Sequence, residues 1–383
     1  MTRVGAPARL AAALGRTEGM SWFRAPGRVN LVGDHTDYND GFVLPLAIDR
    51  DCVIAVRPAG PVRIRSLDLG DSVEVAADGT DDPASVDPAW GRYVAGVVAE
   101  LAELGRPAVG IDAVVASDVP LGSGLSSSAA LEVACAVALS GVAEWQADER
   151  TLATACRAAE ERATGVPCGI MDQLVSLVGQ AGAAMLIDCR SLEARPVPLP
   201  RDLGVLVVNS GMQRSLDATP YADRRRACAE LAEKLGIAAL RDASASAVAD
   251  EPLGRHVVSE NARVLAAERA LLDEDTVRLG EILIESHASL RDDFRVSTPE
   301  LDVLVEKLVA AGAMGARLTG GGFGGAVIAV CPRDAMRGIS DVATARYHEE
   351  TGLEPHAFVC VAADGAGPLT YRSGDGDVVP GKS

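Results

Sequence analysis

Alternating apolar and polar residues mark the first part of the chain as rich in β-structure. A period of two runs through Cys52–Val56, Val62–Ser66 and Ser72–Val75, and the β-branched segment Ile111–Ala116 predicts a further strand. Apolar residues at helical spacing first dominate in Trp90–Leu104. Because strands and helices then interleave along the chain, the pattern predicts an α+β protein with two lobes.

The remaining elements are predicted from the same two periods. Helices are expected at Ala129–Leu139, Glu149–Arg162, Asp223–Leu235, Gly254–Leu272, Asp275–Ser289, Thr298–Ala311 and Ala335–Glu350. Short strands are expected at Ser21–Phe23, Ala183–Ile187, Val205–Val208 and Ala326–Val330, with a last strand at Phe358–Ala362. The polar stretch Asp188–Asp202 predicts the boundary between two domains, residues 1–195 and 196–383.

The composition fits a globular protein with a substantial core, because 48% of the 383 residues are hydrophobic and 23% are charged. The formal net charge of −18 disfavours nucleic acids and acidic membrane surfaces as partners, since both are bound through Lys and Arg. A small anionic ligand is still compatible with this charge where a helix N-terminus, a bound cation or a placed Arg supplies local positive potential.

Eight cysteines are scattered singly along the chain, and no Cys-x-x-Cys pair accompanies the five histidines. This usage argues against a zinc site and indicates small core residues in a reducing compartment, so a cytoplasmic location is expected. The N-terminal segment is too polar for a secretory signal. No run approaches the ~18 apolar residues that a membrane span needs.

The segment Gly27–Gly41 concentrates polar chemistry beside three glycines. Arg28 can meet a phosphate group, and Asp34, His35 and Asp37 can make directional hydrogen bonds to sugar hydroxyls. The plain alternative is a charged turn whose aspartates cap a helix or a strand end, and composition alone favours that alternative.

A loop rich in glycine and serine at Leu121–Ala130 suits a phosphate group. Gly122 and Gly124 allow backbone N–H groups to approach an anion, and the loop opens a helix whose dipole adds favourable potential. The loop is neither a Walker A motif nor a dinucleotide fingerprint. The alternative is an ordinary helix cap by Ser126 or Ser127.

Two further segments invite a functional interpretation. Five glycines lie in the window 320–325, and the loop expected at Arg317–Gly325 is either a tight turn or a close approach to a ligand. Asp172 stands in the largely apolar helix start Cys168–Val175, where a carboxylate is either a cap or a catalytic group.

Taken together, these segments resemble the GHMP kinase superfamily and, within it, the galactokinase family. The similarity to superfamily and family motifs covers Gly27–Gly41, Gly122–Ser128 and Thr319–Gly325. Further similarity to galactokinases covers Cys168–Gln173, Leu186–Leu192 and Ser286–Phe294, with Glu300–Asp302 after it. The resemblance runs in the same order from about Phe23 to Gly325.

The resemblance implies a two-lobed GHMP kinase fold in which a cleft enzyme uses Mg²⁺ and ATP to phosphorylate the C1 hydroxyl of galactose. Asp172 would act as the base for that hydroxyl, and Arg28 would stabilise charge on the transferring phosphoryl group. The implied sugar contacts are Asp34, His35, Thr36, Asp37, Gly169 and Tyr221. The implied ATP contacts are Gly122, Ser123, Gly124, Leu125, Ser126, Ser127 and Ser128. The implied metal ligands are Ser128 and Glu160.

One position departs from the usual family pattern, since Asp34 stands where most galactokinases carry Glu. The shorter side chain leaves a kinase of a related sugar, such as N-acetylgalactosamine, as one alternative. A non-catalytic sensor of sugar and ATP is a second alternative, although Arg28, Ser128, Glu160 and Asp172 are all present. A monomer or weak dimer is expected.

Overall fold

The largest sheet has seven strands and forms the first lobe. The computed structural model describes residues 5–212, 219–371 and 378–380. Across this sheet the strands follow the order β14 (Val378–Pro380), β13 (Gly367–Tyr371), β1 (Ser21–Asn30), β3 (Pro45–Ala59), β6 (Gly110–Ser117), β4 (Val62–Ser66) and β5 (Ser72–Val75). Neighbouring strands are antiparallel except β4 and β6, which are parallel.

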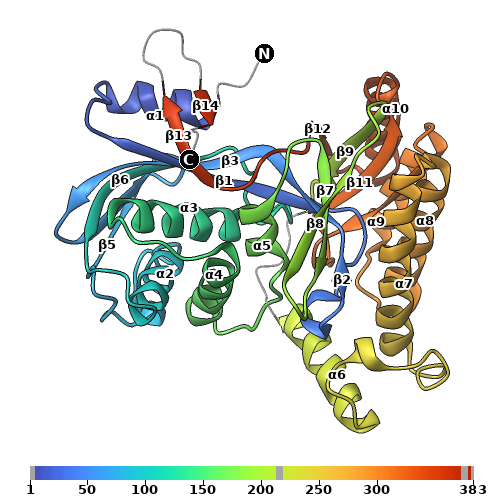
Figure 1. Cartoon of the computed structure of the whole chain (residues 1–383). Coiled ribbons are helices and arrows are strands. Elements are labelled where there is room, and N and C mark those ends of the chain that lie inside the picture. Colours follow the sequence, from blue (N-terminus) through green and yellow to red (C-terminus); the bar gives the residue numbers. More distant parts are fainter. Residues whose placement is uncertain (1–4, 213–218, 372–377, 381–383) are drawn as a thin grey trace.

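Small side chains let helices pack closely on this sheet. On one face lie α2 (Gly91–Glu103), α3 (Ser127–Val142), α4 (Glu149–Thr164) and α5 (Met171–Val178), and α1 (Ala6–Leu14) covers the other face (Figure 1). In α3, Ala130, Ala134 and Ala138 are fully buried, and a Cβ at Gly141 would lie 2.6 Å from the ring of Phe23. This close packing fixes α3 against the sheet. Among the described residues, no helix combines the length and apolar character needed to cross a bilayer.

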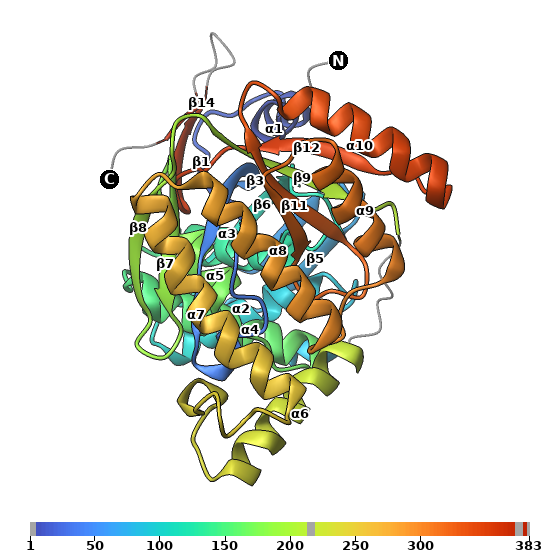
Figure 2. The ribbon, with the colours of Figure 1, turned by 90° about the vertical axis from the view of Figure 1, so that its right-hand side faces the viewer.

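The second lobe contains a four-stranded antiparallel sheet covered by helices. Its strands follow the order β10 (Gly315–Thr319), β11 (Ala326–Pro332), β9 (Leu203–Asn209) and β12 (His356–Cys360). The helices of this lobe are α6 (Thr219–Leu235), α7 (Pro252–Leu272), α8 (Thr276–Asp292), α9 (Pro299–Ala310) and α10 (Met336–Thr351). Helices α8, α9 and α10 pack on the sheet, and α7 packs along α8 (Figure 2). The predicted α+β architecture with two lobes is confirmed.

Short elements join the two lobes. A three-stranded sheet has the order β2 (Phe42–Val43), β7 (Ala183–Asp188) and β8 (Glu193–Pro198), and α7 packs against both of its outer strands. Three turns of 3₁₀-helix lie at η1 (Asp37–Asn39), η2 (Pro83–Ser85) and η3 (Leu240–Asp242). The turn η1 begins seven residues after the end of β1 and belongs to the segment that carries the candidate sugar residues.

Several predicted elements have other bounds in the structure. The strand expected at Ser21–Phe23 runs on to Asn30, because a β-bulge between Pro26 and Arg28 accommodates the proline. Residues 317–319 end strand β10 and are not part of a loop. The polar stretch expected between the domains contains β8, and two strands follow the one expected to be last.

The division at residues 195 and 196 remains a prediction, and two observations bear on it. It would cut through β8, whose strand pairs with β7 along its whole length. It would also separate β13 from β1, although Trp22 and Leu369 pair in one sheet. The C-terminal strands β13 and β14 therefore belong to the sheet of the first lobe, although they follow the second lobe in the chain.

Candidate active site

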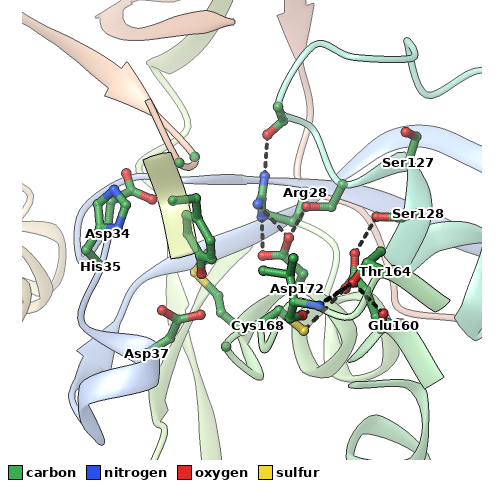
Figure 3. A pocket seen from close by; sticks show the side chains of 18 of the residues that line it. Arg28, Asp34, His35, Asp37, Ser127, Ser128, Glu160, Thr164, Cys168 and Asp172 are labelled. Atoms are coloured by element: carbon green, nitrogen blue, oxygen red, sulfur yellow. Dashed lines mark hydrogen bonds and ion pairs between the residues drawn. The ribbon is translucent and has the colours of Figure 1, made fainter. Parts of the chain in front are cut away.

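A cavity of about 330 Å³ holds most of the residues that sequence reasoning singled out. Figure 3 shows side chains that line it, from β1 and the turn after it, the loop before α3, and helices α4 to α6. The glycine loop after β10 contributes from the second lobe. The lining residues are Arg28, Asp34, His35, Asp37, Gly122, Gly124, Ser126, Ser127, Ser128, Glu160, Thr164, Val166, Cys168, Gly169, Met171, Asp172, Tyr221, Gly320 and Gly321.

Arg28 of β1 and Asp172 of α5 form a bidentate ion pair in this cavity (Figure 3). The Nε and Nη2 atoms of Arg28 donate to Oδ1 and Oδ2 of Asp172 at 2.7 and 2.6 Å. The Nη1 atom donates to the carbonyl oxygen of Gly124 at 2.5 Å, which ties the pair to the loop before α3. Burial lowers the pKa of Arg28, but the charge and hydrogen bonds of Asp172, together with the charges of Asp34 and Asp37, raise the pKa overall. The cavity therefore contains a fixed positive charge.

The loop before α3 has three residues with positive φ. Gly122, Gly124 and Ser126 have φ values of 68°, 77° and 60°, which glycine adopts freely and other residues rarely adopt. Helix α3 begins at Ser127, so the N–H groups of its first turn lack partners within the helix. Unpaired N–H groups and the helix dipole together attract a phosphate group to this place.

Ser126 does not cap α3 with its side chain, so the plain alternative for this loop fails at that residue. Its hydroxyl donates to Oδ2 of Asp172 instead. Ser127 is the first residue of the helix and not its cap. The positive φ of Ser126 thus accompanies a contact of its hydroxyl with the Asp172 carboxylate. Both members of the Arg28–Asp172 pair contact this loop.

Three of the predicted site residues do not line the cavity. The hydroxyl of Ser123 donates to the carbonyl oxygen of Pro120 at 2.7 Å, and the side chain of Leu125 is buried in the core. Thr36 is fully buried, and its hydroxyl donates to two backbone carbonyls at 2.7 Å. These side chains stabilise the loops that carry the lining residues.

The candidate sugar residues share one wall of the cavity. The rings of His35 and Tyr221 lie 5.7 Å apart between their centroids, and His35 has a φ of 65°. A Cβ at Gly169 would lie 1.5 Å from Oδ2 of Asp37, so any larger residue there would displace the Asp37 side chain. Burial, and then the charge of neighbouring carboxylates, raises the pKa of Asp37 to about 6. The wall combines rings with groups that accept and donate hydrogen bonds, as sugar sites do.

Ser128 and Glu160 lie side by side at another wall. The hydroxyl of Ser128 donates to Oε1 of Glu160 at 2.9 Å, and Nε2 of Gln173 donates to Oε2 at 2.6 Å. Burial, followed by the charge of Asp172, raises the pKa of Glu160, which a bound cation would oppose. Among the described residues no group of three or more His, Cys, Asp or Glu is arranged for a metal. Two oxygen donors facing a cavity nevertheless fit Mg²⁺, which keeps waters and phosphate oxygens as its other ligands.

Some lining residues were not assigned to the site from the sequence. They are Thr164, Val166, Cys168, Met171, Gly320 and Gly321. The two glycines belong to the glycine-rich window, so their signal was visible. Nothing local marks the others. The Cys168 thiol lies 3.5 Å from Oε2 of Glu160, and burial raises its pKa.

Three family models match the chain in succession. The galactokinase galactose-binding signature matches residues 9–58, the GHMP kinases N terminal domain matches 92–180, and the GHMP kinases C terminal domain matches 267–349. The first match includes β1 and residues 34–37 of the sugar wall, and the second includes the loop before α3, Gly169 and Asp172, the partner of Arg28. Fold and cavity together therefore define a small-molecule kinase of the GHMP type.

Individual relatives identify the family within this superfamily. The galactokinase of Roseiflexus sp. (strain RS-1) is 44% identical over 361 residues, which cover 90% of this chain and 92% of that protein. The galactokinase of Chloroflexus aurantiacus is 43% identical over 357 residues, or 89% and 92% of the two chains. The chain belongs to the galactokinase family.

Solved structures agree with this placement. The crystal structure of Lactococcus lactis galactokinase complexed with galactose superposes with a TM-score of 0.86 at 31% identity, covering 94% of this chain and 97% of that one. The mevalonate kinase of Methanococcus jannaschii superposes with a TM-score of 0.67 at 18% identity, covering 91% and 100%. The second likeness shows a common fold.

Proposed function

We propose that the protein transfers the γ-phosphoryl group of ATP to the C1 hydroxyl of galactose, giving galactose 1-phosphate and ADP. The observation that carries this proposal is the Arg28–Asp172 pair, which touches the loop before α3 and lines the same cavity as the sugar wall. A phosphate-binding loop, a fixed positive charge and a carboxylate in one cavity are the parts that phosphoryl transfer requires. Family membership supports galactose as the acceptor.

The nucleotide end of the cavity would act through positioning and charge. Backbone N–H groups of Gly122–Ser128 and the dipole of α3 would hold the phosphates of ATP. Arg28 would stabilise the negative charge that spreads over the transferring group. Since the guanidinium is already held by Asp172 and Gly124, little reorganisation is needed when the substrate binds.

Asp172 would orient the C1 hydroxyl and take its proton. The hydroxyl oxygen forms a bond to the γ-phosphorus while the bond to the ADP oxygen breaks, and the proton passes to the carboxylate. Late transfer to a positioned carboxylate suits a loose transition state, in which the nucleophile develops little charge early. Ser126 donates to Oδ2 of the same carboxylate and would keep it in place.

Mg²⁺ would accompany the nucleotide, held by Ser128 and Glu160. The ion would neutralise phosphate charge. Gln173 contacts Glu160 from behind, so it would keep the carboxylate turned toward Ser128.

We also propose a cytoplasmic monomer or weak dimer. The eight cysteines are all free and seven of them are buried, which fits a reducing compartment. Size-exclusion chromatography with light scattering would test the oligomeric state, and a stable tetramer would contradict it.

A coupled assay of ADP release tests the proposed reaction. The acceptors to compare are galactose, 2-deoxygalactose, N-acetylgalactosamine and glucose, each with Mg²⁺ and with excess chelator. We expect ADP release with galactose and Mg²⁺, and none with chelator. Faster turnover of N-acetylgalactosamine than of galactose would identify N-acetylgalactosamine as the preferred substrate. Sugar binding without ADP release would indicate a sensor.

A further inference from the structure

Charged groups from the second lobe hold the turn that carries the candidate sugar residues. Arg317 of β10 is fully buried and pairs with the carboxylate of Asp34, which is 3% exposed. The second guanidinium nitrogen of Arg317 donates to the carbonyl oxygen of Leu31 at 3.0 Å. Asn30 donates to the other oxygen of Asp34 at 3.1 Å. One arginine from the opposite lobe thus grips both the backbone and the side chain of this turn.

Glu260 of α7 contacts the same turn at Gly33, the residue before Asp34. The backbone N–H of Gly33 donates to its Oε1 at 2.9 Å, and Ser286 of α8 donates to that oxygen at 2.6 Å. Arg263 donates to Oε2 at 2.6 Å. Burial would raise the pKa of Glu260, but the charges of neighbouring basic side chains, Arg263 before Arg317, and the hydrogen bond from Ser286 help to lower it to about 2. The carboxylate is therefore ionised, and its charge is matched by arginine.

A neutral histidine completes this support. Burial lowers the pKa of His256 to about 4, so its ring carries one proton at neutral pH. With Nε2 protonated, it donates to the carbonyl oxygen of Asp34 at 3.1 Å, and Nδ1 accepts from the hydroxyl of Ser289 at 2.9 Å. The ring of Phe294 lies 4.6 Å from that of His35 and 4.7 Å from that of His256. The segment Ser286–Phe294, which resembled galactokinases without a stated role, thus lies behind the sugar wall.

The plain alternative is that these groups only join the two lobes. An ion pair that merely joined lobes could be replaced by apolar packing at little cost in stability. Here the charged groups contact Leu31, Gly33 and Asp34. His35, which has a positive φ, follows directly, and Asp37 of the cavity wall lies two residues further on. A backbone held at positive φ needs surroundings that enforce it.

We propose that Arg317 and Glu260 are positioning residues for the sugar site, which fix the turn Gly33–His35 from the second lobe. This inference rests on the proposed function, because it assigns the turn to sugar binding. Sugar affinity is then set partly by residues that never touch the sugar. Nucleotide affinity should depend on them less, because Arg28 and Asp172 hold the loop before α3, although Thr319 and Gly320, which follow Arg317 in the chain, lie against Gly124.

Arg317→Lys and Ser286→Ala test the proposal. Lysine keeps the charge but cannot grip two acceptors in a fork, and Ser286→Ala removes one hydrogen bond to Glu260. We expect Arg317→Lys to raise the KM for galactose about 10- to 100-fold, since small misplacements at a site cost this much. Ser286→Ala should give a smaller rise in the same constant. The KM for ATP should rise much less than the KM for galactose in either variant.

Arg24→Lys is the matched control. Arg24 also forms a bidentate pair, with Asp51, and donates to the carbonyl oxygens of Asp364 and Gly365, yet it lies outside the cavity. Its substitution should lower the melting temperature and leave the KM for galactose unchanged. The proposal is overturned if Arg317→Lys behaves like Arg24→Lys, or if the KM values for galactose and ATP rise together.

Hydrogen exchange separates this inference from the proposed reaction. The Gly33 amide donates to Glu260, so its exchange should accelerate in Arg317→Lys and stay slow in Arg24→Lys. If the unmodified protein phosphorylates no sugar, the proposed function fails, and the exchange still reports on the turn. Equal exchange of Gly33 in both variants would contradict the positioning role. Ser286→Ala supplies the same readout if Arg317→Lys does not fold.

Discussion

Two arginine–aspartate pairs lie at or beside the cavity, and they differ in how exposed they are. In Arg28–Asp172 the side chains are 6% and 28% exposed, whereas in Arg317–Asp34 they are 0% and 3% exposed. The first pair is accessible to a substrate, because its carboxylate is partly exposed and lines the cavity. The second pair is almost entirely buried, so it is suited to hold its turn in place, although Asp34 reaches the cavity wall. Under our proposals, the same two residue types serve catalysis in one place and positioning in the other.

This contrast predicts different kinetic consequences. A change at the partly exposed pair Arg28–Asp172, here called the open pair, should appear in kcat, because its groups would act on the transition state. A change at the buried pair Arg317–Asp34, here called the closed pair, should appear in the KM for the sugar, because it alters ground-state binding. The following substitutions test the contrast, beginning with the largest expected effect.

Asp172→Ala should abolish measurable turnover, since the loss of a general base costs about 10²–10⁴-fold and the partner Arg28 loses its orientation as well. The fold should survive, because the carboxylate is partly exposed at the cavity. Kinetics and a thermal melt would measure both. The control is Asp112→Asn, which removes the partner of Arg57 in an exposed pair. A near-normal kcat in Asp172→Ala would remove this residue from the mechanism.

Arg28→Lys should lower kcat about 10²-fold, a loss typical of a missing donor at a developing charge. Lysine cannot reproduce the two parallel bonds to Asp172 together with the third bond to Gly124. Steady-state kinetics at saturating galactose and ATP would measure the effect. Arg57→Lys on the sheet surface should keep full activity, and a normal kcat in Arg28→Lys would contradict the proposed charge stabilisation.

The KM for galactose should rise several-fold as the pH falls through about 6, the pKa of Asp37. The ordinary value is 3.8, so the folded protein takes up the proton before an unfolded chain does. Below this pH the group loses an acceptor for sugar hydroxyls. For stability the sign is opposite, because the buried charge destabilises the fold as the pH rises from about 4 to 6.

Asp37→Asn provides the check on that titration. The amide does not titrate, so the KM for galactose should become independent of pH in this range while lying above the normal value. Across the same pH range, the melting temperature of the variant should rise relative to that of the unmodified protein as the pH increases. A KM profile that still bends near pH 6 in the variant would assign the titration to another group.

Asp34→Glu should have the smallest effect and keep or improve activity on galactose. The charge that neutralises Arg317 is retained, and the added methylene has space because Asp34 lines the cavity. Measuring kcat/KM for galactose and N-acetylgalactosamine in both proteins would test this expectation. A large loss of kcat/KM on galactose would show that the pair does not tolerate the longer side chain.

Local patterns predicted those elements whose burial alternates. Strand β4 alternates buried and exposed residues at every position, and Val62–Ser66 was predicted with its observed bounds. Strand β8 was missed because only Val197 is buried in it, so no alternation is visible. Strand β1 was cut short because Pro26 and Gly27 usually end strands, whereas here a bulge accommodates them.

The open part of the site was predictable, and the closed part was not. Arg28, Asp172 and the glycine-serine loop lie in segments whose composition is unusual and resembles a known family. Arg317 was expected in a loop, and Glu260 lies within a helix without local peculiarity. Their role depends on contacts between segments more than 200 residues apart, which no local pattern contains.

Strand β13 has a consequence for how the protein is made. It pairs with β1, so the edge of β1 remains open until the ribosome has synthesised nearly the whole chain. At about 5–20 residues per second this takes roughly tens of seconds. An unpaired strand edge is a template for other chains, so the nascent protein is most prone to aggregate while its second lobe is being translated. Shortening the chain after β12 would make that temporary exposure permanent.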